Sequence, residues 1–328
     1  MQVRNARIKG IGYFVPKRIL TNYEIEHMVE TTNEWIVERS GIHERRILDK
    51  DHMNAEMAVE AARDALDNAG LAAGEIDLII IATITPDYFT PSMACMVQSE
   101  IGAVNAAAFD LNAACSGFVY ALATGSQFIA SGIYNNVLVI GCEGLSKVID
   151  WGHRSTCVLF GDGAGAVVLT ASDNPSILEF DLGASGHLGK AITIPGTHFT
   201  EEDLEARNNE HAHTIRMDGR EVFKFATKTM AASITKLLND NNLTMDDIDL
   251  IIPHQANIRI MQTAAKRLGI SMDKIFSVIH KYGNTSSASI PIALHDAVKE
   301  DKIKAGDRII LTGFGGGLTW ASVIIEWV

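Results

Sequence analysis

Cys115 lies in a stretch of small and apolar residues, FDLNAACSGFVYAL, that covers residues 109–122. Residues 106–112 are typical of a strand, and the residues from Ser116 onward have the apolar spacing of a buried helix. We therefore expect Cys115 at a helix N-terminus, where unpaired backbone N–H groups and the helix dipole favour a thiolate. Such a thiol could act as a nucleophile, but the pattern also fits a cysteine that only fills space. The local sequence leaves both interpretations open.

Two further polar residues follow apolar runs in the second half of the chain. IIPHQANIRI places His254 directly after an expected strand, and YGNTSSASIP places Asn284 in a loop before a helix expected over about 286–299. Loops after strands are where α/β proteins collect catalytic residues. A cysteine, a histidine and an asparagine at such junctions could form a nucleophilic site. A cysteine hydrolase uses the same residue types and stays an alternative.

Two glycine-rich segments call for different interpretations. FGDGAGAVVLT, residues 160–170, is followed by a strand instead of a helix, so it does not fit a dinucleotide or phosphate loop and is interpreted as a tight turn. GFGGGLTW, residues 313–320, lies between two expected strands. Its consecutive glycines allow close approach to a ligand, and its backbone N–H groups could face a developing oxyanion.

The elements that position these residues occur twice along the chain. Three pairs of matching positions share an offset of 172 residues: Asp77 and Asp249, Leu71 and Leu243, and Val137 and Ile309. Each half contains apolar, β-branched runs that suit buried strands, alternating with helical patterns. The sequence therefore predicts an α/β fold of two similar halves, 1–172 and 173–328, with a site at their junction.

Composition narrows the classes of partner. The 328 residues carry 28 Lys and Arg against 40 Asp and Glu, a net charge of −12, which disfavours nucleic acid. No apolar run reaches the roughly 18 residues that a membrane span needs, and the first residues lack the apolar core of a signal peptide. The four cysteines are scattered and form no metal motif. We expect a cytoplasmic protein with reduced thiols, no metal and no membrane association.

Four motifs in order, AACSGF, PHQANIRI, YGNTSSASIP and GFGGGLTW, together with the early TTNEWIVERSGIHERR, resemble the β-ketoacyl-[acyl carrier protein] synthase III family. The resemblance covers essentially the whole chain. It implies the duplicated thiolase-like fold, with buried mixed sheets and helices in layers, and a homodimer. It also implies a decarboxylative Claisen condensation of an acyl-CoA primer with malonyl-[acyl carrier protein] through an acyl-Cys115 intermediate. That reaction initiates fatty acid synthesis, and acyl-CoA is a substrate, so no cofactor is required.

The resemblance also assigns roles to individual positions. Cys115 is the implied nucleophile, with His254 and Asn284 beside it, and the backbone N–H groups of Cys115 and Gly316 form the implied oxyanion hole. The positions implied to bind coenzyme A are Trp35, Arg39, Ser40, Arg154 and Asn257.

A basic patch for the acidic carrier protein is expected on the helix after His254. Arg259 and Lys266 are seven residues apart and share a face, while Ile258, Met261, Ala265 and Leu268 are expected to form its buried stripe. The family resemblance supports a docking patch made of Lys224, Arg259, Lys266 and Arg267. An ordinary solvated helix face remains the alternative.

The segment PDYFTPSMAC resembles the loop that, across a dimer interface, forms the floor of the acyl pocket. Many family members have Phe directly before the proline, whereas here Thr90 precedes Pro91 and Phe89 is shifted by one position. A smaller residue at the floor leaves room for a longer or branched acyl chain, and each added methylene is worth about 0.8 kcal/mol of burial. We therefore expect no strict preference for acetyl-CoA.

Two alternatives share the fold but differ in function. One is a synthase III-like acyltransferase of specialised metabolism that uses another acceptor or donor. The other is a non-catalytic subunit that binds carrier protein, which the presence of Cys115 disfavours.

Overall fold

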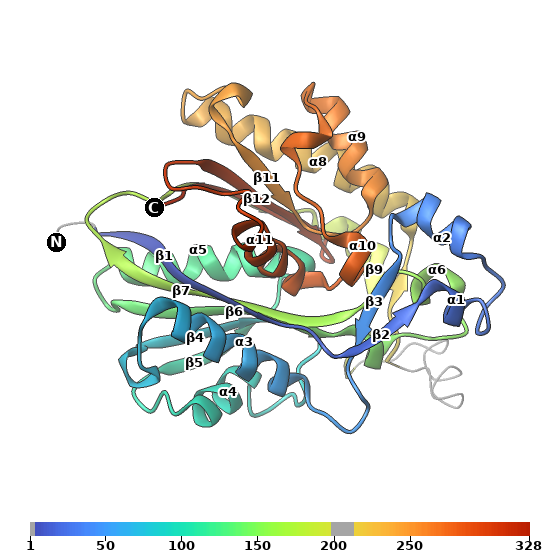
Figure 1. Ribbon diagram of the computed structural model, residues 1–328, viewed down its shortest axis with the longest axis horizontal. Coiled ribbons are helices and arrows are strands. Elements are labelled where there is room, and N and C mark those ends of the chain that lie inside the picture. Colours follow the sequence, from blue (N-terminus) through green and yellow to red (C-terminus); the bar gives the residue numbers. More distant parts are fainter. Residues whose placement is uncertain (1–3, 198–212) are drawn as a thin grey trace.

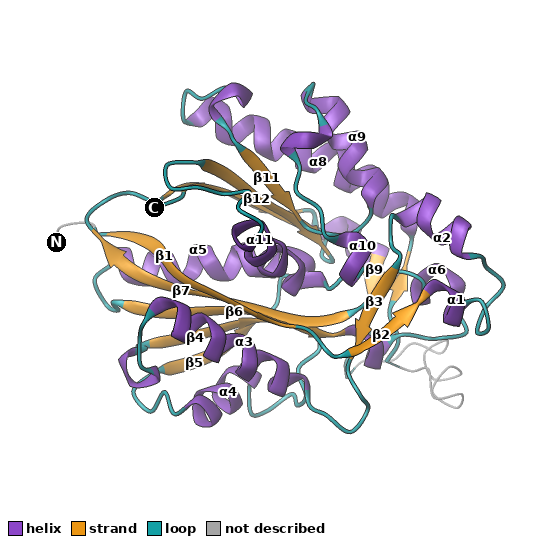
Figure 2. Cartoon of the chain, viewed as in Figure 1, coloured by secondary structure: helices purple, strands orange, loops and turns teal. Residues whose placement is uncertain are grey.

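The computed structural model describes residues 4–197 and 213–328, which form five layers of alternating helices and sheets. Helices α3 (Asn54–Ala69) and α4 (Met93–Ile101) cover the outer face of one sheet, and α8 (Gly219–Asp240) and α9 (Ile258–Leu268) lie outside the other (Figure 1). Figure 2 shows the two central helices between the sheets. None of the helices in these two ranges is both long enough and apolar enough to cross a bilayer.

The first sheet has five strands. In spatial order they are β1 (Asn5–Phe14), β7 (Asp162–Ser172), β6 (Asn136–Gly144), β4 (Leu78–Ala82) and β5 (Ala107–Leu111). Strand β4 is parallel to both β5 and β6, whereas β7 is antiparallel to β6 and β1. All five residues of β4 are buried, as expected for an apolar run covered on both faces.

The second sheet has four strands. In spatial order they are β11 (Leu250–Pro253), β12 (Arg308–Gly315), β13 (Thr319–Glu326) and β8 (Ile177–Ala184). Here β11 and β12 are parallel and the other pairs are antiparallel. Listed from β8 to β11, the strand order of this sheet matches the order β1-β7-β6-β4 of the first sheet. The second sheet has no equivalent of the edge strand β5.

The central layer consists of α5 (Gly117–Ala130) and α11 (Ser289–Lys299), which contact both sheets. Helix α5 contains no charged residue, and nine of its residues are buried. Its apolar composition predicted this position, because a helix that is apolar on all sides must be covered on all sides.

The duplication is visible in the first residues of equivalent strands: 5 and 177, 78 and 250, and 136 and 308 each differ by 172. The predicted α/β fold with mixed sheets and layered helices is confirmed. All strands of the first sheet lie within residues 5–172 and all strands of the second within 177–326. This distribution supports the division into 1–172 and 173–328, which we keep as a proposal.

A smaller group of elements, which the sequence did not predict, covers one end of the molecule. It contains the antiparallel pair β2 (Arg18–Thr21) and β3 (Glu44–Ile47), with α1 (Asn22–Ile25), α2 (Asn33–Ser40), α6 (Arg154–Cys157) and α10 (Ile279–Tyr282). The short pair β9 (Ile192–Thr193) and β10 (Arg216–Met217) also forms a separate sheet. The 3-10 turns are Ala73–Glu75, Ala114–Ser116, Leu145–Val148, Gly186–Ala191, Met245–Asp247, Met272–Lys274 and Ser286–Ala288.

One local prediction is wrong. The glycine-rich residues 160–170 do not form a tight turn, because β7 starts at Asp162 and contains Gly163 and Gly165. They are required by packing. A Cβ on Gly165 would lie 2.7 Å from the Cβ of Pro291 in α11, and one on Gly163 would lie 2.9 Å from Ile292. Glycine here lets the central helix approach the sheet closely.

Candidate active site

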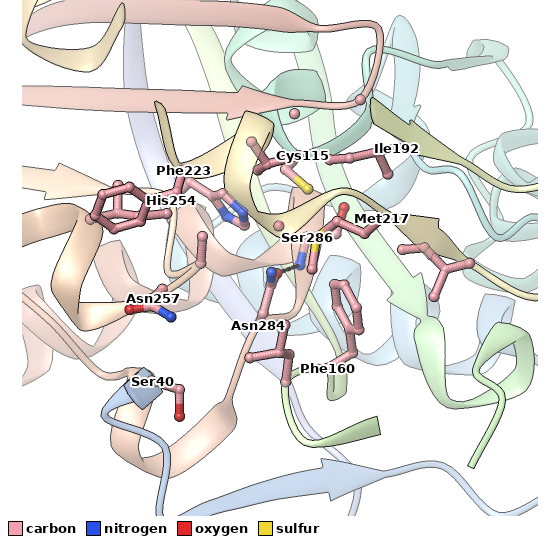
Figure 3. Close-up of a pocket in the computed structure, with 18 of the residues that line it drawn as sticks. Ser40, Cys115, Phe160, Ile192, Met217, Phe223, His254, Asn257, Asn284 and Ser286 are labelled. Carbon is pink, nitrogen blue, oxygen red and sulfur yellow. Dashed lines mark hydrogen bonds between the residues drawn. The ribbon is translucent and has the colours of Figure 1, made fainter. Parts of the chain in front are cut away.

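A pocket of about 260 Å³ brings the predicted site residues together (Figure 3). Cys115, Asn284, His254 and Gly316 line its inner part. Trp35, Arg39, Ser40 and Asn257 also line it. Most of the remaining lining is apolar: Ile84, Leu145, Val158, Phe160, Ile215, Met217, Phe223, Phe225, Phe314 and Leu318 contribute to it. The pocket is therefore suited to an apolar chain that ends at a few polar groups.

Cys115 is held in the 3-10 turn that precedes α5, as the sequence predicted. The preceding residue, Ala114, has a φ of 47°, a left-handed conformation that is unusual for a residue with a Cβ. Its N–H donates to Asn112 Oδ1 at 3.3 Å. Behind the turn, the Ser116 hydroxyl lies 2.8 Å from both Ala113 O and Thr319 Oγ1 and donates its single proton to one of them. These contacts fix the sulfur at the pocket wall.

The protonation state of this sulfur differs from the expected one. Burial raises the pKa of the Cys115 thiol to about 12, while the neighbouring Ser286 hydroxyl lowers it and the Glu143 charge raises it. The expectation of a resting thiolate is therefore wrong. Desolvation of the anion is the largest influence on this pKa. The thiol must lose its proton when a substrate is attacked.

His254 follows β11 and is 2% exposed. Its Nδ1 lies 2.7 Å from the Ser289 hydroxyl, which also accepts the backbone N–H of Gln255 at 3.3 Å. The Ser289 proton is thus free to be donated to Nδ1, which leaves the ring proton on Nε2 as a donor. Burial lowers the pKa of His254 to about 3, so the imidazole is neutral.

Asn284 is fixed by its own loop. Its Oδ1 accepts the backbone N–H of Ser286 at 2.9 Å, which leaves the side-chain NH₂ as the available donor. The backbone N–H of Asn284 donates to Leu159 O at 2.9 Å, and its carbonyl accepts the Gly161 N–H at 3.0 Å. Figure 3 shows Asn284, His254 and Cys115 directed into the same space. The site thus combines a thiol with two uncharged hydrogen-bond groups.

The glycine-rich loop after β12 lies directly against Cys115. A Cβ on Gly315 would lie 2.5 Å from the backbone N of Cys115, closer than real side chains approach. At Gly316 the nearest atom to such a Cβ is the Cβ of Ala114, at 3.4 Å. The backbones of Cys115 and Gly316 therefore line the same small region beside the sulfur.

Of the residues implied to bind coenzyme A, four line the pocket, namely Trp35, Arg39, Ser40 and Asn257, and Arg154 lies beside Trp35 outside the lining. The Arg154 guanidinium is 5.0 Å from the centre of the Trp35 ring and donates to Glu30 O at 3.0 Å. Asn257 donates to the carbonyl of Arg39 at 2.9 Å. Ser40 differs from the others because its hydroxyl donates to Ile36 O at 2.6 Å and accepts the Ile42 N–H at 3.1 Å. The Ser40 hydroxyl thus stabilises the C-terminal end of α2.

The predicted docking residues are on the outer helices. Arg259, Lys266 and Arg267 are exposed on α9, and Lys224 is exposed on α8, 3.9 Å from Glu221. The predicted buried stripe of α9 needs a correction. The buried residues are Ile260, Met261, Ala264 and Ala265, whereas Ile258 and Leu268 are only half-buried. Ile258 is near the helix start, where its side chain lies against Gly41 of the neighbouring loop.

Phe89 and Thr90 do not line the pocket that contains Cys115. Both are exposed, and the Phe89 side chain is 82% accessible. Within one chain these residues are therefore separate from the thiol.

One buried acid next to the site was missed by the sequence analysis. Glu143, at the end of β6, is fully buried and accepts hydrogen bonds from Ser286 and Ser287 in the loop after Asn284. Burial raises the pKa of Glu143 to about 7 against the effect of these donors. The signal was present in the sequence, because a glutamate in the otherwise apolar run NVLVIGCEG must find partners.

Two similar layered halves, with a cysteine facing a histidine and an asparagine in the pocket between them, define a protein of the thiolase fold. Residues 109–186 match the family described as 3-oxoacyl-[acyl-carrier-protein (ACP)] synthase III, and residues 238–327 match its C-terminal part.

Individual relatives agree with this match. The chain is 48% identical to β-ketoacyl-[acyl-carrier-protein] synthase III of Clostridium acetobutylicum, over 99% of both chains. It superposes on the crystal structure of 3-oxoacyl-[acyl-carrier-protein] synthase III from Aquifex aeolicus with a TM-score of 0.91 and 47% identity, covering 98% of this chain and 100% of that one. A priming β-ketosynthase from a polyketide pathway gives a TM-score of 0.93 at 35% identity, covering 99% and 97%. The chain belongs to the 3-oxoacyl-[acyl carrier protein] synthase III family of acyltransferases.

Proposed function

We propose that this enzyme condenses an acyl-CoA primer with malonyl-[acyl carrier protein] to give a 3-oxoacyl-[acyl carrier protein], the first condensation of fatty acid synthesis. One observation carries the proposal: the Cys115 thiol shares an apolar pocket with two neutral hydrogen-bond groups, His254 and Asn284. A hydrolase would need an activated water at this place. A condensing enzyme needs donors for an enolate, and neutral donors do not repel it.

In the first half-reaction, the sulfur of Cys115 attacks the thioester carbonyl of the primer and coenzyme A leaves. The carbonyl oxygen becomes negative in the tetrahedral intermediate. The backbone N–H groups of Cys115 and Gly316 are the proposed donors to this oxygen, because the glycine loop lies against the Cys115 turn. Loss of one such donor typically costs about 100- to 1000-fold in rate.

In the second half-reaction, the malonyl group loses carbon dioxide and leaves an enolate. Nε2–H of His254 and the NH₂ of Asn284 stabilise its oxygen. The enolate carbon then attacks the acyl carbonyl on Cys115 and the thiol is released. The low pKa of His254, about 3, keeps the imidazole a neutral donor at neutral pH. No metal or redox cofactor takes part in either half-reaction.

The pocket entrance and the outer helices are proposed to bind the two substrates. Trp35 and Arg154 now stack on each other at 5.0 Å, and we propose that they separate so that the ring and the guanidinium stack on the two faces of the adenine of coenzyme A. Arg39 and Asn257 lie next along the entrance. The exposed cations Arg259, Lys266, Arg267 and Lys224 are proposed to bind the acidic carrier protein, despite the overall charge of −12.

We also propose a cytoplasmic homodimer in which a second copy completes the acyl pocket. Strand β5 is an edge strand with half-exposed Phe109 and Leu111, and Phe89 nearby is 82% accessible. An unpaired edge beside exposed aromatics is typical of an interface. With Thr90 in place of a larger residue at the pocket floor, primers longer than acetyl should be accepted. Preference for acetyl-CoA tenfold over hexanoyl-CoA and longer chains would contradict this.

A second candidate is a priming acyltransferase of specialised metabolism. The likeness to a polyketide-pathway priming ketosynthase, with a TM-score of 0.93, favours it. The two functions differ in acceptor, so turnover with malonyl-[acyl carrier protein] of fatty acid synthesis separates them.

The decisive experiment traps the acyl group and follows its fate. Incubation with acyl-CoA should add one acyl mass to the peptide that contains Cys115. Addition of malonyl-[acyl carrier protein] should then release a 3-oxoacyl product. Cys115→Ser, as the matched control, should carry no acyl group while retaining its fold. Release of free acid would contradict the condensation and favour a hydrolase.

A further inference from the structure

Glu143 is a buried carboxylate that the proposed reaction has not used so far. Its Oε2 accepts the Thr85 hydroxyl at 2.7 Å and the Thr83 hydroxyl at 3.3 Å. These hydroxyls themselves accept backbone N–H groups, at 2.9 Å from Gly144 and 3.0 Å from Thr85. Their protons are therefore directed to the carboxylate. The backbone N–H of Ile84 donates to it as well, at 3.1 Å.

The other side of the carboxylate faces the active site. Its Oε1 accepts the Ser287 hydroxyl at 2.9 Å and the Ser286 hydroxyl at 3.2 Å. Ser287 has a second acceptor, Ala82 O, at 2.8 Å, and points away from the pocket. Ser286 instead lines the pocket next to Cys115, and its hydroxyl lowers the pKa of the Cys115 thiol (Figure 3). A serine hydroxyl holds one proton, so Ser286 can accept from the thiol while it donates to Glu143.

The site needs a group that can take the thiol proton, because Cys115 is a neutral thiol at rest. His254 is a poor acceptor, since burial lowers its pKa to about 3 and Ser289 occupies its Nδ1. Glu143 is a better one, because burial raises its pKa to about 7. The charge of Glu143 raises the pKa of two thiols, those of Cys115 and Cys142. Asp87 and Asp162 act in the same direction on Cys142.

We propose that Ser286 and Glu143 form a proton relay that deprotonates Cys115 during acyl transfer from acyl-CoA. The S–H bond of Cys115 breaks and its proton passes to Ser286 Oγ, while the Ser286 proton passes to Glu143 Oε1. The sulfur electron pair forms the new C–S bond to the thioester carbon. When the bond to coenzyme A breaks, the leaving sulfur takes the electron pair and recovers the proton from Glu143 through Ser286. The inference rests on the proposed acyl-Cys115 function.

The test measures acyl-enzyme formation in single-turnover experiments with hexanoyl-CoA, by intact-mass spectrometry of quenched samples between pH 5.5 and 9. For the wild type we expect the rate to rise with pH and level off above about 7, as Glu143 ionises. Glu143→Gln should lower the plateau by about 100-fold and abolish this rise, because general-base loss typically costs at least that factor. Ser286→Ala should have the same two effects, although it leaves the carboxylate in place.

Ser287→Ala is the matched control, since it removes another hydroxyl from Glu143 without touching the path to Cys115. It should stay within about fivefold of the wild type and keep the pH-dependent rise. Equal losses in Ser286→Ala and Ser287→Ala, or an unchanged pH profile in Glu143→Gln, would overturn the relay and leave a packing role. If Glu143→Gln does not fold, Ser286→Ala against Ser287→Ala decides alone. A wild type that forms no acyl-enzyme would instead overturn the proposed function, and the relay with it.

Discussion

The turns that begin the two central helices are built alike. In the first, Ala114 has a φ of 47° and donates its N–H to Asn112; in the second, Ser286 has a φ of 48° and donates its N–H to Asn284. The equivalent positions differ by 172 residues, since 284 − 112 and 286 − 114 both give this number. The same turn conformation thus occurs twice, once in each half of the duplicated chain.

What differs is the strand end that covers each turn. The turn of Cys115 lies against Gly313 and Gly315 of β12, whereas the turn of Ser286 lies against Gly141 and Glu143 of β6. Gly315 and Glu143 are equivalent positions, because 315 − 143 is 172. Glycine lets the end of β12 approach the Cys115 turn closely. Glutamate fills the same place in the other half and binds the hydroxyls there. The comparison indicates that the Cys115 turn, the open turn, remains accessible to substrate. The Ser286 turn, the closed turn, is covered by Glu143 and supports the Cys115 turn.

The strongest test of this contrast exchanges the nucleophile. Ser287 is equivalent to Cys115, since 287 − 115 is 172, but it is fully buried. Cys115→Ser should lower acyl-enzyme formation by about 10³-fold or more. The double variant Cys115→Ser with Ser287→Cys should not restore it, because the second turn is closed. Acylation of the new cysteine, detected by peptide mass spectrometry, would show that the two turns are equally accessible.

The two asparagines provide a second test. Asn284→Ala removes a donor to the enolate and should lower the condensation rate by about 100- to 1000-fold. Its effect on acyl transfer should be within a few fold. Asn112→Ala is the matched variant from the other turn, where the side chain is exposed and serves only the backbone. It should change both rates by less than about fivefold.

Steady-state condensation and single-turnover acylation, measured on the same preparations, separate these effects. If Asn112→Ala impaired condensation as strongly as Asn284→Ala, the asparagines would be turn-forming residues in both halves, and the donor role of Asn284 would be lost.

A third test adds one carbon at the open turn. In Gly315→Ala the new Cβ would meet the Cys115 backbone at 2.5 Å, so the turn must move. A displacement of about 1 Å at a reacting group can cost about 100-fold, and we expect a loss of that order in acyl transfer. Gly316→Ala is the control, because its Cβ has 3.4 Å to its nearest neighbour. Similar activities of the two variants would contradict the required close approach.

Much of this arrangement could be predicted from the sequence. Buried β-branched runs indicated the main strands, and the absence of charge in the helix after Cys115 indicated its central position. Cys115 and His254 each follow a strand, so their approximate places could be predicted, whereas Asn284 follows the short helix α10 and not the expected strand. The β2–β3 pair was not predicted, since it carries charged residues and lacks a long apolar run.

Other features depend on partners that are distant in the sequence. Glu143 and Ser286 are 143 residues apart, and no local pattern indicates which carboxylate a loop hydroxyl will meet. The thiolate prediction failed for a similar reason. A helix N-terminus is a local property, whereas the desolvation that raises the pKa of Cys115 comes from the whole pocket.

The smallest expected effect is on the free energy of unfolding. Of the two turns, only the closed turn lies against a buried acid, Glu143. The pKa of Glu143 rises from 4.5 to about 7 on folding, so the folded protein binds more protons than the unfolded chain between these values. Its contribution to the free energy of unfolding therefore decreases as pH rises through that window. At about 1.4 kcal/mol per pKa unit, the decrease relative to Glu143→Gln should be about 1–3 kcal/mol.

Urea unfolding of both proteins at pH 5, 6, 7 and 8 measures this difference. The opposite titration of His254, which favours folding as pH rises, is present in both proteins and cancels. A difference that stayed constant with pH would mean that Glu143 is ionised in the folded protein throughout this range. The five donors around it would then fully offset its burial, and the closed turn would hold a fixed charge instead of an exchangeable proton.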